Sequence, residues 1–269
     1  MTDYFDKLVL AKDPSNLREF ARRQDLIDKF LQEKRDAFNE LGPRSTAVLV
    51  YEGRLVDLYT QEGNFDKALN SAKLVYQGLA SVEKNEDDSL VEALINLGSA
   101  YLNVHDLEKA QAIGAKANLY TSINTLPLYY ELMARIAHVH KDNTKEVKNY
   151  LDAYNSAKEA FGDEAIRTAE WKVALALCYE RQNYFQNALF TYNQVKSEEN
   201  KLGLTNEESI SLEARIAYCM TKMGQTEEGL IKLQKSKELA HNELGSGHPT
   251  TLKIKEFIFS LEAKTNTNN

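Results

Sequence analysis

LINLGSAYLNVHDLEKAQAIGAKA, residues 94–117, is the stretch that decides the fold of this 269-residue chain. Its bulky residues recur three to four positions apart, as they do on one face of an α-helix. Its small residues, among them Gly98, Ala110 and Gly114, fall where two helices would have to approach each other closely. The stretch therefore predicts two antiparallel helices that pack face to face.

The same pattern resembles the tetratricopeptide repeat, because Leu94, Leu97 and Tyr101 are followed by Ala110 at the spacing of that motif. Such a repeat is a pair of helices that stacks on further copies of itself, so a long chain can form one elongated domain. The resemblance implies an all-α fold: an α-α superhelix (TPR-like solenoid) of about five helical hairpins with N- and C-terminal capping helices.

The motif recurs along most of the chain. The residues that we expect to be equivalent to Ala110 stand at positions 68, 110, 149, 188 and 229, in steps of 42, 39, 39 and 41. The third repeat is aligned by the sequence ARIA, which occurs at 134–137 and again at 214–217. We expect a cap at 1–44, repeats at about 45–82, 83–126, 127–162, 163–203 and 204–248, a capping helix at 249–264 and a disordered tail at 265–269.

The first and last segments predict the two caps. An apolar stripe follows Asp13, the expected N-cap, and Pro14, and it ends at Gly42, so we expect one long helix that covers the first repeat. The period exceeds the 34 residues of the common repeat. The link LGSGHPTT from residue 244 resembles those between the repeats of kinesin light chains, although no long heptad segment is present to bind a heavy chain.

Composition excludes several classes of protein. With 43% hydrophobic and 27% charged residues, the chain is typical of a folded helical protein. A net charge of -7 argues against nucleic acid as a partner, since binding to phosphates requires a cationic surface. The N-terminus has acids in place of a basic signal sequence, and no segment approaches 18 apolar residues, so we expect a cytoplasmic protein without membrane insertion.

No motif for catalysis, a cofactor or a metal is found, so we expect a protein that is not an enzyme. His138 and His140 cannot chelate one ion together, because residues two apart on a helix point roughly 200° apart. Cys178 and Cys219 occupy one position of successive repeats, for which we expect Leu58, Ala100 and Val139 in the others. A small buried side chain is therefore expected there.

Three arginines suggest a binding groove. The residue just before the expected core pair of each first helix is Arg54, Asn96, Arg135, Ala174 or Arg215. In tetratricopeptide proteins this face lines the concave groove, and an extended acidic peptide could span arginines about 20 Å apart. The arginines could instead be satisfied internally, as by Glu131 four residues before Arg135. The predicted groove comprises Arg54, Asp57, Gln61, Asn96, Ser99, Asn103, Arg135, His138, Leu177, Arg181, Arg215, Tyr218 and Lys222.

These features favour a protein–protein interaction scaffold or adaptor that binds an extended or helical segment of a partner in the groove. Two alternatives stay open: a peptide-sensing regulatory protein that changes conformation when a ligand binds, and a non-catalytic subunit or assembly factor of an enzyme complex. The sequence leaves open the partner, the oligomeric state, and whether the groove or the convex face binds.

Overall fold

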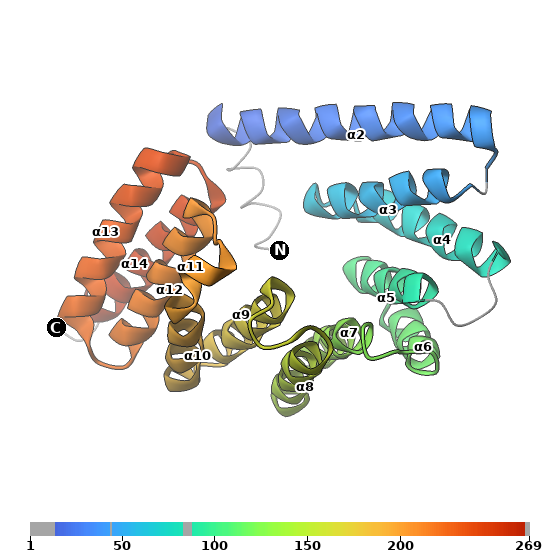
Figure 1. Ribbon diagram of the computed structural model, residues 1–269. Coiled ribbons are helices and arrows are strands. Elements are labelled where there is room, and N and C mark those ends of the chain that lie inside the picture. Colours follow the sequence, from blue (N-terminus) through green and yellow to red (C-terminus); the bar gives the residue numbers. More distant parts are fainter. Residues whose placement is uncertain (1–13, 44, 83–87, 267–269) are drawn as a thin grey trace. The chain divides into compact units, whose positions relative to one another are not determined.

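The computed structural model describes residues 14–43, 45–82 and 88–266, and every regular element in these ranges is a helix (Figure 1). Asp13 and residues 267–269 lie outside the described residues. Five pairs of helices follow one another: α3 (Thr46–Gln61) and α4 (Phe65–Val82), α5 (Asp88–Asn103) and α6 (Leu107–Asn118), α7 (Leu126–Val139) and α8 (Asn143–Phe161), α9 (Ile166–Arg181) and α10 (Phe185–Ser197), α12 (Asn206–Lys222) and α13 (Thr226–Leu244). The predicted fold class is confirmed.

Three helices lie outside these pairs. Helix α2 (Pro14–Leu41) precedes the first pair, the short α11 (Glu199–Leu202) follows α10, and α14 (Pro249–Asn266) follows the last pair. Because α14 continues to Asn266, the expected disordered tail at 265–269 begins inside a helix. Contacts divide the chain into two compact units. Among the described residues, the first unit is 20–161, and the second is 162–266 together with 14–19.

Each pair closes through a three-residue turn of the same geometry. One residue of every turn has a positive φ, which reverses the chain at the end of the first helix. The backbone amide five residues after the positive-φ residue donates to the carbonyl of the last turn residue. In the first pair, the amide of Ala68 donates to the carbonyl of Asn64 at 3.0 Å. The positive-φ residues are Gly63, His105, Lys141, Asn183 and Gly224, with φ of 72°, 62°, 58°, 64° and 95°.

This shared turn corrects the predicted alignment of the third repeat. Lys141 takes the place of Gly63, so the residue equivalent to Ala68 is Glu146, whose amide donates to the carbonyl of Asp142 at 2.9 Å. The alignment on Asn149 was wrong by three residues. The equivalent positions are 68, 110, 146, 188 and 229, in steps of 42, 36, 42 and 41.

The correction changes which residues of α7 are buried. Ile136, which is 4% exposed, occupies the position of the two cysteines, whereas Val139 is 50% exposed. The two ARIA sequences, at 134–137 and at 214–217, therefore do not occupy equivalent positions in their repeats. Ala134 is the residue equivalent to Ala217, and both are buried.

The apolar residues of α2 to α7 in the first unit form three clusters. Gly98 allows α5 to lie against α7, because a Cβ atom there would come within 2.9 Å of a Leu132 methyl group. Helix α2 packs on α3 through Ile27, which contacts Leu55 and Tyr59. This helix therefore caps the first pair, as the sequence predicts.

The second unit repeats this arrangement with α14 as its cap. Ile254, Phe257 and Leu261 of α14 pack on α12 and α13. The links before α9 and α14 share one device, since the hydroxyl of Thr168 donates to the carbonyl of Gly162 at 2.7 Å and that of Thr251 to Gly245 at 2.8 Å. Gly162 and Gly245 both have a positive φ.

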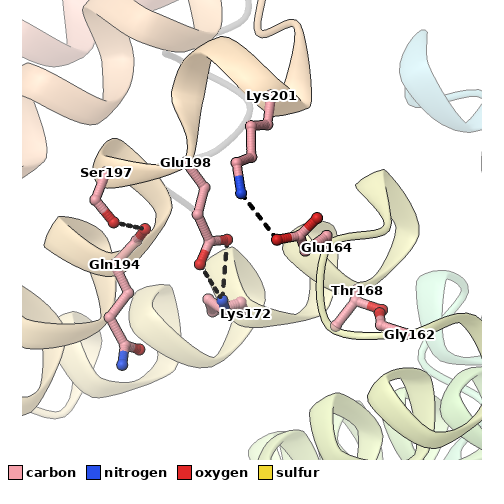
Figure 2. Close-up of polar contacts among 8 residues, drawn as sticks. All are labelled: Gly162, Glu164, Thr168, Lys172, Gln194, Ser197, Glu198 and Lys201. Carbon is pink, nitrogen blue, oxygen red and sulfur yellow. Dashed lines mark hydrogen bonds and ion pairs between the residues drawn. The ribbon is translucent and has the colours of Figure 1, made fainter.

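A buried lysine fastens α9 to the end of α10. Lys172 is 3% exposed, and its Nζ lies 3.3 Å from Glu198 Oε2 (Figure 2). Lys201 of α11 pairs with Glu164 at 2.8 Å beside it, in the link before α9. Since a buried ammonium is costly without a carboxylate, Glu198 and Lys172 are expected to be required together.

Both cysteines should resist modification in the folded protein. Cys178 and Cys219 are fully buried and form no disulfide, and burial raises the pKa of the Cys219 thiol to about 12. Because the thiolate is the reactive form, we expect iodoacetamide at pH 8 to alkylate them at least about a hundred times more slowly than glutathione. Mass spectrometry with and without urea checks this. Rapid labelling without denaturant would contradict the buried packing.

Candidate partner-binding site

Six of the predicted groove residues line one cavity of the first unit. The cavity has a volume of about 430 Å³ and is bounded by α3, α5 and α7, the first helices of three consecutive pairs. Ile95 and Leu132 contribute apolar surface to it. The six predicted residues are Asp57, Gln61, Asn96, Ser99, Asn103 and Arg135. They come together because residues three, four and seven apart share one face of a helix.

Arg135 reaches from the third pair to the second. Its Nη2 donates to Oδ1 of Asn103 at 3.0 Å, which links α7 to α5. Asp57 and Glu131 line the same cavity, but neither forms an ion pair with Arg135 among the described residues, so the guanidinium bonds only the neutral amide of Asn103 there. Across the cavity, burial raises the pKa of the Asp57 carboxyl above its usual range.

Two predicted residues of the first unit lie apart from this cavity. Arg54 is exposed and stacks on the ring of Phe30 in α2, with 5.2 Å between its Cζ and the ring centroid. The Nδ1 of His138 lies 3.2 Å from the carboxylate of buried Glu146 in α8, so His138 takes part in the contact within its own pair. The shifted alignment of the third repeat explains this, since His138 does not share the groove face of α7.

In the second unit, Arg215 is satisfied internally. Its Nη1 donates to both carboxylate oxygens of Glu180, at 2.9 and 3.0 Å, and Tyr192 Oη donates to the same carboxylate at 2.9 Å. Burial lowers the pKa of Arg215, but Glu180 and Tyr192 together outweigh burial, and the net pKa is raised. No sequence motif marks Glu180 or Tyr192 as partners, and Glu180 stands 35 residues before the arginine.

The other predicted residues of this unit mostly pack within it. Tyr218 stacks on Phe257 of α14 with ring centroids 4.3 Å apart, and Lys222 lies over Tyr218 at 5.0 Å. Leu177 packs against the core of the unit, and Arg181 is exposed. That Arg54, Arg135 and Arg215 line one continuous groove stays a prediction, because Arg54 and Arg135 belong to one unit and Arg215 to the other.

The described part of the chain contains neither a candidate metal cluster nor a candidate membrane span. Within residues 14–43, 45–82 and 88–266, no three acidic, histidine or cysteine side chains lie together as a metal site would require. Across the same ranges, no helix has the length and hydrophobicity of a membrane span.

Comparison with known proteins supports the fold. No protein-family model matches the sequence, and no curated protein matches it. Among solved structures, the chain is similar to BtubC (BKLC) from P. vanneervenii, with a TM-score of 0.61 and 16% identity over 86% of this chain and 93% of that one. It is also similar to a putative kinesin light chain from Podospora anserina with nearly identical TPR-like repeats, with a TM-score of 0.56 and 16% identity over 72% and 95% of the two chains. With the shared turn geometry, these likenesses show that the protein has the tetratricopeptide-repeat fold.

Proposed function

We propose that the protein is a non-catalytic interaction module that holds a segment of a partner protein in the cavity of the first unit. The observation that carries the proposal is the convergence of six polar side chains from three helix pairs on one cavity. Concave sites that combine apolar surface with a few placed polar groups are the usual form of ligand pockets.

The chemistry of the cavity suits a peptide. The amides of Gln61, Asn96 and Asn103 both donate and accept hydrogen bonds, as a peptide backbone requires. Ile95 and Leu132 offer apolar contact for a side chain, and Arg135, which forms no ion pair with the carboxylates of the cavity, can donate to a carboxylate of the bound segment. A short extended or helical segment with an acidic residue therefore fits best.

Reversing the charge of Arg135 should abolish binding in this cavity. In Arg135→Glu, the new carboxylate would lie in a cavity that already contains Asp57 and Glu131. We expect at least about a tenfold loss of affinity for an acidic segment. To measure it, a photo-crosslinking amino acid at Ser99 captures the partner from an extract of the source cells, with and without the substitution.

Arg54→Glu is the matched control, since Arg54 is exposed and does not line the cavity. Crosslinks from Ser99 should map to one contiguous segment of one partner, disappear in Arg135→Glu and persist in Arg54→Glu. Circular dichroism verifies that both variants are folded. Crosslinks that are equally abundant in both variants would refute the proposal.

A further inference from the structure

The second unit has a separate cavity with mainly apolar walls. It has a volume of about 360 Å³ and is bounded by α9, α10, α11 and α12, by Leu204 before α12 and by Thr250 of α14. Val173, Leu204 and Leu212 line it, and Ile166 at its edge is 59% exposed. A cavity of this size admits one or two aliphatic side chains.

The charges around this cavity are acidic. Glu170, Glu207 and Glu208 line it, and Arg215 is the only basic residue that does. Arg215 donates two hydrogen bonds to Glu180, so its charge is already neutralised. Arg215, one of the three arginines from which an acidic partner was predicted, therefore gives this cavity no net positive charge.

The three carboxylates differ in their hydrogen-bond partners. Glu208 accepts hydrogen bonds from Thr205 and caps α12, and Glu207 accepts one from Thr250 at 3.0 Å. Glu170 is exposed and forms no hydrogen bond or ion pair with another described residue. No positive side chain thus neutralises Glu170. Glu207 Oε2 lies 3.8 Å from Nε2 of His248, and neither Glu207 nor Glu208 is paired with a lysine or arginine.

We propose that this cavity anchors an aliphatic side chain of a partner segment that carries lysine or arginine beside the anchor. The apolar walls bury the anchor. The three carboxylates attract the flanking cations, and this attraction mainly affects the specificity and the rate of association. This proposal rests on the chain being an interaction module and names the partner chemistry of its second unit, opposite in charge to that of the first.

Peptide selection tests the proposal without knowledge of the natural partner. A displayed library of random 12-residue peptides is selected on the full chain, and each bound peptide is then tested on three variants. Glu170→Lys reverses an exposed charge at the cavity. Ser211→Phe fills the cavity without a change of charge, since Ser211 lines it. Glu227→Lys, at an exposed glutamate of α13 that does not line the cavity, is the matched control.

We expect a group of peptides that bind at least about tenfold more weakly to Glu170→Lys and to Ser211→Phe but not to Glu227→Lys. These peptides should contain Leu, Ile, Val or Met next to Lys or Arg, and their binding should weaken when salt rises from 50 to 300 mM, as screening predicts.

Three results would overturn the proposal: no peptide is sensitive to Glu170→Lys, the sensitive peptides are acidic, or Ser211→Phe has no effect on them. The last result would mean general attraction to an acidic surface. Each is distinguishable from failure of the proposed function, because the bound peptides are also tested on Arg135→Glu, and those that lose binding there report on the cavity of the first unit.

Discussion

Glu180→Leu should destabilise the second unit by about 3 kcal/mol, because it leaves the buried guanidinium of Arg215 without its carboxylate. Only 11% of the Glu180 side chain and 20% of the Arg215 side chain are exposed, so water replaces the lost partner poorly. The substitution also removes the acceptor of the Tyr192 hydroxyl. Urea unfolding followed by the fluorescence of Trp171, the single tryptophan, measures the loss in this unit.

Two controls separate the ion pair from general damage to α9. Glu170→Leu alters an exposed glutamate of the same helix and should change stability by less than about 0.5 kcal/mol. The double variant Glu180→Leu with Arg215→Met should recover much of the loss, since apolar replacement of a buried pair is often close to neutral. If the double variant is less stable than Glu180→Leu alone, isolation of the arginine is not the cause.

Gly229→Ala should lower the stability of the second unit by about 2 kcal/mol through overpacking. A Cβ atom at Gly229 would lie 2.8 Å from the carbonyl oxygen of Ala217 and 3.0 Å from the amide nitrogen of Thr221, both backbone atoms of α12. Helices α12 and α13 would have to separate. The equivalent residues Ala68, Ala110 and Ala188 are fully buried alanines, so a sequence comparison alone would suggest that alanine is harmless here.

Gly53→Ala is the matched control, because a Cβ atom at this helical glycine meets nothing within 4 Å. We expect it to stabilise the first unit by about 0.5 to 1 kcal/mol through the helix propensity of alanine. Thermal unfolding by circular dichroism records both variants. If Gly229→Ala also stabilises the protein, the close approach of α12 and α13 is not real.

The fold was predictable because its signal is periodic. Apolar residues at helical spacing and a small residue early in each second helix recur at nearly constant intervals, and a stack of helix pairs needs little else. The two caps followed from the same logic, since the exposed face of the first and last pairs must be covered.

The third pair misled the sequence analysis for a physical reason. It has Lys141 where the first pair has a glycine and Glu146 where three pairs have alanine, so its turn lacks the usual markers. A left-handed lysine is tolerated at that turn, and buried Glu146 obtains a partner from His138. Neither the positive φ of Lys141 nor the pairing of Glu146 with His138 can be recognised from the spacing of apolar residues.

Side-chain partners were the least predictable part of the site. Arg135 and Arg215 could both be assigned to the groove face of their helices. Arg135 nevertheless donates to a neutral amide, whereas Arg215 donates to a carboxylate. The difference depends on single residues 32 and 35 positions earlier, Asn103 and Glu180. Periodicity says which helices face each other but not which pairs of polar atoms meet.

Because the helix pairs within each unit pack mainly against the pairs next to them in the chain, neither unit is organised around a shared centre. A defect introduced in one pair should therefore be felt by its immediate neighbours and fade beyond them. Such a molecule can gain or lose a whole hairpin, or change the side chains of one cavity, while the other cavity keeps its shape.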